Sequence, residues 1–184
     1  GLPGPGSSSP IFWDNKLFVT CYTGYGIDQK NVGEPKDLGR MLLCLDRASG
    51  KILWKKTVPL ANPDDDYRGY LTEHGYASAT PVTDGKHVFA FFGKSGVHAF
   101  TVDGEKVWSK QVGDSSSNRR WGSAASPILF GGMLIVNAAD ESRAIIAFDQ
   151  ATGDEKWRYE MGKLELTYNT PTVHTPKSGR TELV

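Results

Sequence analysis

Short apolar runs that alternate with turn residues organise this chain. The clearest stretch, residues 78–112, reads SATPV, TDGK, HVFAFF, GKSG, VHAFTV, DG and EKVWSKQV in succession. Apolar runs of this length bounded by Asp-Gly or other Gly-containing turns are typical of β-hairpins, because Gly adopts the positive φ that tight turns require. The pattern therefore predicts four consecutive antiparallel strands in this stretch.

The same pattern recurs with a period of about 45 residues. Each unit opens at a Ser-Pro or Thr-Pro pair and closes on a strand that carries Trp; the prolines are Pro10, Pro81, Pro127 and Pro171. The first interval is longer than the others because two insertions interrupt the first unit. A four-stranded unit of this length cannot bury both of its faces alone, so the units must stack on one another. Radial stacking of such sheets gives a β-propeller.

We therefore predict an all-β chain that forms an arc of a β-propeller, with about three and a half four-stranded antiparallel blades of a ring of seven or eight. The whole of 1–184 is predicted to be part of one domain. The expected blades are 7–58, which carries the insertions, then 77–112 and 123–161, with the first half of a further blade at 168–184. Because the fourth unit stops inside its second strand, we expect the chain to be a fragment of a larger propeller.

Composition and charge narrow the range of partners. The 21 Gly, 10 Pro, 8 Phe, 7 Tyr and 5 Trp suit short strands joined by tight turns. Lys and Arg together number 21, as do Asp and Glu, so the chain lacks the basic excess of a nucleic-acid binder. No apolar run approaches the ~20 residues of a membrane-spanning helix. We predict no nucleic-acid partner and no membrane span.

A turn motif precedes the last strand of each unit. Residues 147–157 read AFDQATGDEKW and match Ala-x-Asp-x-x-Thr-Gly-x-x-x-Trp; residues 44–54, CLDRASGKILW, are a close variant, and residues 99–108 are a variant one residue shorter. This resembles the tryptophan-docking motif of the pyrroloquinoline-quinone (PQQ) repeat family, within the quinoprotein alcohol dehydrogenase-like superfamily. Gly permits the turn, and Trp brings a large apolar area to the seam between sheets. The resemblance assigns this structural role to Asp46, Gly50, Trp54, Gly104, Trp108, Asp149, Gly153 and Trp157.

The resemblance implies two functional classes. Quinoprotein dehydrogenases of the family hold PQQ and Ca²⁺ in the central funnel of an eight-bladed ring and oxidise alcohols, with an Asp as base. Many other members, bacterial and extracytoplasmic, keep the repeats without the cofactor. Several alcohol-oxidising members close a disulfide between adjacent cysteines against the cofactor, whereas Cys21 and Cys44 are 23 residues apart.

We therefore expect a non-catalytic interaction scaffold, located in the periplasm or on the cell surface, as the family resemblance implies. No catalytic residue, cofactor or metal site is predicted. The alternative is a PQQ-dependent alcohol dehydrogenase whose cofactor ligands lie mainly on blades outside this sequence. PQQ with Ca²⁺ is expected only under that alternative.

The two cysteines are expected to be buried free thiols. Alignment of the units on their turns places Cys21 with Phe91, and pairing about the turn at 93–96 sets residue 91 opposite residue 98, one position from the equivalent of Cys44. Because side chains alternate along a strand, the two thiols then point to opposite faces of the sheet. A disulfide is the alternative if the long insertion shifts the register.

The long connections all fall at one end of the predicted blades. They are residues 24–40, 59–75, 113–122 and 162–169. Irregular loops on a rigid scaffold carry recognition, so we predict a protein or small-molecule partner on this long-loop face. The candidate binding residues are Glu73, His74, Arg119, Arg120 and Trp121. Arg and Trp are effective anchors at interfaces.

An acidic run, residues 64–66, lies on the same face. An acidic binding patch and oxygen donors to Ca²⁺ are two interpretations of it. The run lacks the alternating ligand spacing of a calcium-binding loop, so a solvated loop is the expected structure.

Overall fold

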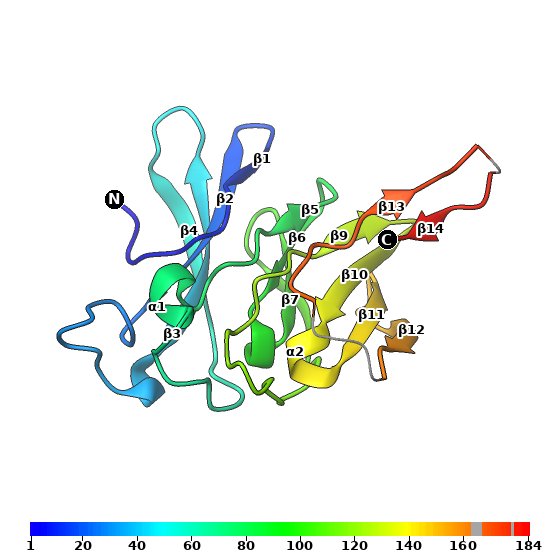
Figure 1. Ribbon diagram of the computed structural model, residues 1–184. Coiled ribbons are helices and arrows are strands. Elements are labelled where there is room, and N and C mark those ends of the chain that lie inside the picture. The colour runs from blue at the N-terminus through cyan, green and yellow to red at the C-terminus, as the bar shows by residue number, and fades with distance from the viewer. Residues whose placement is uncertain (163–166, 178) are drawn as a thin grey trace.

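The chain forms a curved row of antiparallel sheets. The computed structural model describes residues 1–162, 167–177 and 179–184 (Figure 1). Three sheets have four strands each, in the orders β1-β2-β3-β4, β5-β6-β7-β8 and β12-β11-β10-β9, and a two-stranded sheet of β13 and β14 follows. The prediction of an all-β arc of a propeller is confirmed, whereas the exact blade boundaries and the size of the ring stay predictions.

The strands are short, and single-turn helices interrupt the connections. The first sheet contains β1 (Ile11–Trp13), β2 (Lys16–Thr23), β3 (Gly39–Asp46) and β4 (Ile52–Val58). The second contains β5 (Val82–Thr83), β6 (His87–Phe91), β7 (Val97–Thr101) and β8 (Lys106–Lys110). The third contains β9 (Ile128–Phe130), β10 (Met133–Ala138), β11 (Ala144–Asp149) and β12 (Glu155–Glu160). The remaining elements are β13 (Val173–His174), β14 (Glu182–Leu183), the 3-10 turns η1 (Pro35–Asp37) and η2 (Gly93–Ser95), and the helices α1 (Leu71–His74) and α2 (Ala139–Ser142).

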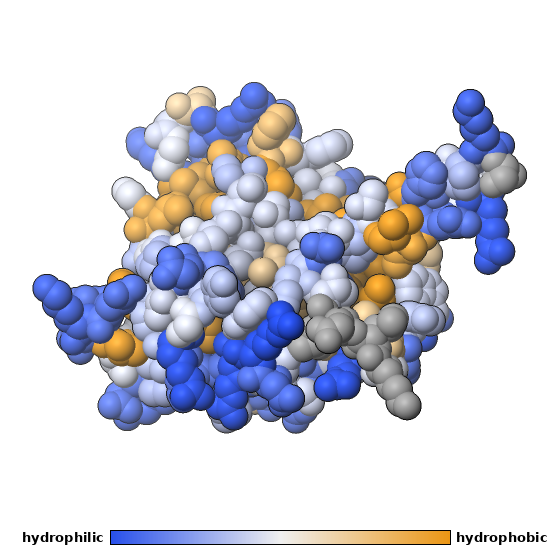
Figure 2. All heavy atoms as spheres, viewed as in Figure 1, coloured by the Kyte–Doolittle hydropathy of each residue, from blue (hydrophilic) through white to orange (hydrophobic). Residues whose placement is uncertain are grey.

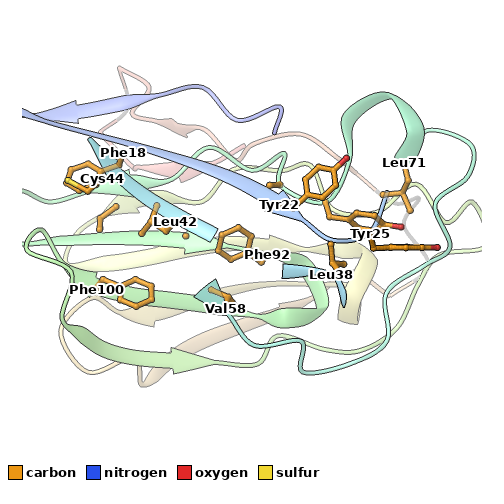
Figure 3. Close-up of a cluster of buried hydrophobic side chains, with 14 residues drawn as sticks. Phe18, Tyr22, Tyr25, Leu38, Leu42, Cys44, Val58, Leu71, Phe92 and Phe100 are labelled. Atoms are coloured by element: carbon orange, nitrogen blue, oxygen red, sulfur yellow. The ribbon is translucent and has the colours of Figure 1, made fainter. Parts of the chain in front are cut away.

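The sheets pack face to face through two apolar seams. Alternate residues of one strand enter different seams: Val88 of β6 lies in the first seam and Phe89 in the second. Figure 3 shows the first seam, in which Phe18 and Leu42 of the first sheet meet Phe100 of the second. Full burial of such a side chain stabilises the fold by about 1.5–3 kcal/mol. The inner strands of neighbouring sheets therefore hold one another through these seams.

A repeated hydrogen bond joins the starts of successive units. The backbone N–H of Ser9 donates to Thr80 Oγ1 at 3.0 Å, that of Thr80 donates to Ser126 Oγ at 2.9 Å, and that of Ser126 donates to Thr170 Oγ1 at 3.0 Å. These are the Ser and Thr residues of the Ser-Pro and Thr-Pro pairs that open the units. The hydroxyls of Thr80, Ser126 and Thr170 therefore each accept a bond from the preceding unit, which fixes the spacing between first strands.

The Trp residues of the turn motif lie against the glycines of the next unit. Trp54 Nε1 donates to Val102 O at 3.2 Å, and Trp108 Nε1 donates to Gln150 O at 2.9 Å. A Cβ atom on Gly104 would lie 3.0 Å from the Trp54 ring, and one on Gly153 would lie 2.6 Å from the Trp108 ring. The indole therefore occupies space that any larger residue at those turns would need.

The acidic residues of the motif close the same turns. Asp46 accepts hydrogen bonds from the backbone and the hydroxyl of Ser49, which lower the pKa of its carboxyl. Asp149 accepts a backbone bond from Thr152, and the hydrogen bond that it accepts from the side chain of Lys156 is the largest cause of its lowered pKa. The first of these turns ends at Gly50, whose φ of 68° favours glycine.

The third Trp of the motif, Trp157, lies half-buried on β12.

Both cysteines are buried and free, as expected. Cys44 lies in the first seam beside Phe18, whereas Cys21 packs on the opposite face of the first sheet with Leu43. Burial raises the pKa of the Cys44 thiol to about 11, which keeps it protonated and unreactive at neutral pH.

The register predicted for the second unit is wrong by one residue. Phe91 pairs with Val97, not with residue 98, because the connection at 93–95 folds as a 3-10 turn closed by a bond from Phe92 N–H to Gly96 O. Phe18 pairs with Cys44, and Phe89 pairs with Ala99, so Phe18 and Phe89 occupy equivalent positions in the two units. Three residues further on, Cys21 is therefore equivalent to Phe92 and not to Phe91. Both the strand pairing and the alignment between units were thus one residue off, and the two errors cancel. The prediction that the thiols of Cys21 and Cys44 point to opposite faces of the sheet is therefore correct.

Removal of the Ser126 hydroxyl tests the hydrogen bonds between units. Ser126→Ala leaves the backbone N–H of Thr80 without its acceptor, and we expect the free energy of unfolding to fall by about 1 kcal/mol in urea denaturation. Ser109→Ala, on an exposed position of β8, is the control and should stay within about 0.5 kcal/mol of the unmodified chain. Equal losses in the two variants would contradict a specific role of this bond.

Candidate functional site

The long connections gather at one end of the sheets. In Figure 1, α1, α2 and the long loops lie at the end opposite to the tight turns that join β1 to β2 and β3 to β4. In Figure 2 this lower end is covered mostly by hydrophilic side chains, whereas orange, hydrophobic side chains gather over the first sheet. The predicted connection 162–169 lies partly outside the described residues. The long-loop face is thus a polar surface built by loops from different units.

An aromatic cluster occupies this face. Trp121 packs edge-on against Tyr70 with ring centres 4.6 Å apart, and its ring lies 5.5 Å from that of Tyr168. The guanidinium of Arg119 lies over Trp121, 4.7 Å from the ring centre, as in a cation–π contact. We refer to Tyr70, Arg119, Trp121 and Tyr168 as the aromatic cluster. Its members come from three separate segments of the chain.

His74 fixes Trp121 in this position. Its Nε2 lies 2.8 Å from Trp121 O, so the ring donates to that carbonyl, and its Nδ1 lies 2.6 Å from Ser78 Oγ. Because both ring nitrogens are engaged with groups of the chain, His74 is a positioning residue. It ties α1 to the loop that carries Trp121.

Of the five predicted binding residues, the structure brings His74, Arg119 and Trp121 together. Glu73 is exposed on α1 and accepts a 3.4 Å bond from Thr72 Oγ1. Arg120 is exposed in a turn, with a φ of 52° and a backbone bond to Ser117 O. Sequence reasoning missed Tyr70 and Tyr168, since a single Tyr in a loop carries no pattern that distinguishes it.

A second feature, which we call the acidic pocket, lies beside the aromatic cluster. It is a cavity of about 30 Å³ whose walls include Leu71 and Gly122, the direct neighbours of Tyr70 and Trp121 in the chain. Loops of all three four-stranded sheets contribute to it. Its charged residues are Arg40, Asp64, Asp65, Lys94, Asp140 and Glu141.

Two ion pairs form one side of the acidic pocket. Arg40 Nη2 lies 2.5 Å from Asp64 Oδ1, and its other nitrogens donate to Tyr76 O and Ser95 Oγ, both at 3.0 Å. Lys94 Nζ lies 3.4 Å from Asp65 Oδ1. The guanidinium therefore holds three elements of the fold together.

The expectation that residues 64–66 form a solvated loop is wrong for two of the three. The side chains of Asp64 and Asp65 are only 11% and 9% exposed, whereas that of Asp66 is 66% exposed. The cations that pair with the two buried carboxylates lie 24 and 29 residues away in sequence. Long-range pairing of this kind leaves no local signal.

The helix α2 supplies the other side of the pocket. Asp140 Oδ1 accepts the backbone N–H of Ser117 at 3.1 Å, and Glu141 Oε1 is hydrogen-bonded to Ser123 Oγ. Glu141 is only 2% exposed. Burial, with the charge of Asp140 as the next cause, raises the pKa of Glu141 to about 8, and burial raises that of Asp140 as well.

The described residues show neither a metal cluster nor a membrane helix. No group of three His, Cys, Asp or Glu side chains in the described ranges is arranged to hold a metal ion. Among the same residues, no helix has the length and apolar character needed to cross a bilayer.

Comparison with known proteins identifies the family. Residues 38–181 match the family model described as outer membrane protein assembly factor BamB, which is more than half of the chain. The chain belongs to this family. No curated protein sequence matches it significantly.

Solved structures of low sequence identity share the fold. BamB from Moraxella catarrhalis aligns over 99% of this chain and 49% of its own, with a TM-score of 0.62 and 17% identity. A europium-containing methanol dehydrogenase aligns over 81% of this chain and 23% of its own, with a TM-score of 0.55 and 12% identity. Quinohemoprotein alcohol dehydrogenase from Comamonas testosteroni aligns over 85% and 21%, with a TM-score of 0.54 and 16% identity. The chain thus spans about half the length of that BamB.

The raised pKa of Glu141 predicts a pH dependence of stability. Between its ordinary pKa and about 8, the folded chain keeps a proton on Glu141 that the unfolded chain has lost. The free energy of unfolding therefore falls as pH rises through this range, by at most about 1.4 kcal/mol per pH unit from this group. Glu141→Gln removes the titration, so its urea-denaturation midpoint should fall less between pH 5.5 and 7.5.

Glu160→Gln is the matched control, because Glu160 is exposed on β12. It should retain the steeper profile of the unmodified chain. Parallel profiles for Glu141→Gln and the unmodified chain would show that Glu141 does not bind a proton on folding.

Proposed function

We propose that this chain is part of a cofactor-free β-propeller that acts outside the cytoplasm and binds another protein through its long-loop face. Membership of the BamB family supports a scaffold role, since the family model is described as an assembly factor for outer membrane proteins. The observation that carries the proposal is the aromatic cluster, an ordered group of anchor side chains on the loop-bearing face.

The cluster has the composition of a protein-binding hot spot. Tyr, Trp and Arg are enriched where interfaces gain most of their affinity. Tyr70 is 54% exposed, and Trp121 is half-buried, so both present ring surface to a partner. The bond from His74 to Trp121 O and the contacts between the rings order the group before binding, which reduces the entropy lost in a complex.

Two polar cavities lined by described residues of the long-loop end and of the β10 edge do not fit PQQ. PQQ is a planar three-ring quinone with three carboxylates, whereas the acidic pocket measures about 30 Å³ and holds four carboxyl groups against two cations. A larger groove of about 470 Å³ beside β10 is lined by uncharged residues, among them Asn137, Ile145 and Thr170, which offer no cation to the carboxylates. Cys21 and Cys44 lie on opposite faces of the first sheet.

Site-specific photocrosslinking tests the binding face in the full-length protein in its own cells. A benzophenone amino acid at Tyr70 should give a specific adduct with one cell-envelope protein. Tyr159 on β12 is the matched control, because it is also an exposed Tyr, 58% against 54%, but lies outside the long loops. Trp121→Ala should remove most of the Tyr70 adduct while the thermal melt shows that the protein stays folded. No adduct at Tyr70, or equal adducts at both positions, would refute the proposal.

Reconstitution tests the dehydrogenase alternative. On addition of PQQ and Ca²⁺ to the full-length protein, we expect no shift of the quinone absorption and no dye-linked oxidation of alcohols. A PQQ-dependent alcohol dehydrogenase treated in parallel provides the positive control. Alcohol oxidation at a comparable rate would replace the scaffold proposal with the enzymatic one.

A further inference from the structure

The acidic pocket contains more negative than positive charge. Its two cations are each committed, Arg40 to Asp64 and Lys94 to Asp65. Within the described residues, neither Asp140 nor Glu141 has an ion-pair partner. When all four carboxyls are ionised, the pocket carries two more negative than positive charges, and a proton on Glu141 removes one of them. Electrostatic balance therefore favours a bound cation.

Unpartnered oxygen atoms mark where that cation would lie. Glu141 Oε2 and Asp64 Oδ2 are buried and have no hydrogen-bond partner in the described part of the chain. Both residues line the cavity, and Glu141 is only 2% exposed. A buried acceptor without a donor costs about 1–3 kcal/mol, more when charged. A ligand with several N–H donors would satisfy both atoms.

The size and the walls of the cavity select among cations. The cavity is small, about 30 Å³, and its two unpartnered oxygens suit the three N–H donors of a compact ammonium group better than the five of a planar guanidinium. Leu71, Phe91 and Phe92 form apolar wall suited to a methylene stem. The aromatic cluster adjoins the pocket through Leu71 and Gly122 and offers ring faces that attract cations.

We propose that the acidic pocket binds a primary alkylammonium group, namely a lysyl side chain of the partner protein, with Glu141 and Asp64 as acceptors. The inference rests on the proposed function, because it supplies the chemistry by which a partner on the long-loop face is recognised. The three N–H donors of an ammonium meet the unpartnered oxygens, and its single positive charge replaces that of the proton that Glu141 releases. A lysyl segment would place its stem between the apolar walls and its backbone against the aromatic cluster.

Binding is coupled to a proton. The pKa of Glu141, about 8, keeps its carboxyl mostly protonated at neutral pH, so the ammonium must displace that proton. The charged and titratable groups that face Glu141 across the pocket are Arg40 on β3, Asp64 and Asp65 on the connection to α1, Tyr76 after α1, Lys94 on η2, and Asp140 on α2. We expect affinity to rise from pH 6 to pH 8, by at most about tenfold per unit.

Calorimetric titration of the purified full-length protein with n-butylammonium chloride and with a capped Gly-Lys-Gly peptide tests the proposal at constant ionic strength. Both probes should bind, and the peptide acetylated on its lysine should not. Titration in two buffers of different ionisation enthalpy should show proton release at pH 7 in the unmodified chain, a measurement that needs no variant. Glu141→Gln should weaken both probes at least tenfold and abolish the proton release, whereas Asp66→Asn, an exposed neighbour of the pocket, should change neither.

Further measurements distinguish a lysyl side chain of a protein from a free amine. Trp121→Ala should weaken the peptide but not n-butylammonium; equal effects on both would indicate a free amine and overturn the lysyl assignment. Binding of the acetylated peptide, insensitivity to Glu141→Gln, or tighter Glu141-dependent binding of Ca²⁺ would overturn the ammonium site. A Tyr70 crosslink that persists in full in Glu141→Gln cells would also refute it while the proposed function stands. Absence of that crosslink refutes the proposed function and leaves the titration unaffected, so the two failures are distinguishable.

Discussion

A sheet with apolar residues on both faces cannot be stable in water unless both faces are covered, and this constraint determines the structure. In β6, Val88 and Ala90 enter one seam while Phe89 and Phe91 enter the next. The usual alternation of apolar and polar residues in a half-exposed strand is therefore absent. The four-stranded unit has no independent core, and its stability depends on the units beside it. The Trp residues, which contact turn glycines of the next unit, strengthen the same seams.

The stacking also places the candidate site. Because the sheets lie side by side with their strand ends aligned, loops that are far apart in sequence meet at the long-loop end. Arg40 of the first sheet bonds to Ser95 of the second, and Glu141 of the third bonds to Ser123 in the loop before β9. The acidic pocket therefore forms only when the three sheets stack correctly, because its walls come from loops of all three.

The sequence predicts the repeated part of this structure well and the unique part poorly. Three features recur in successive units: the Ser-Pro and Thr-Pro pairs, the Gly turns and the Trp positions. Because they recur at the same places, together they predict repeated four-stranded sheets. The pairing of Phe91 with Val97 depended on the conformation of one turn, which GKSG alone does not specify. Long loops with Arg and Trp pointed to Arg119 and Trp121, but their contacts with Tyr70 and Tyr168 depend on the tertiary fold.

The burial of Asp64, Asp65 and Glu141 shows a different limit. Their charges suggest solvent exposure, and only partners on other units make burial possible. A single sequence contains no sign that Arg40 and Asp64 will meet. A polar pocket of this kind can be identified only from the three-dimensional arrangement of the loops.

The hydrogen bonds at the Ser-Pro and Thr-Pro pairs have a direction: each unit donates its N–H to the next and receives from the one before. This head-to-tail contact recurs at all three described junctions, so the bond itself does not set the number of units, which closure of a ring would set. A gene that gains or loses one whole unit preserves every junction that remains. Insertions such as those in the first unit are confined to one end of the sheets, where they do not disturb these bonds. The architecture therefore lets evolution change the number of units and the content of the loops independently.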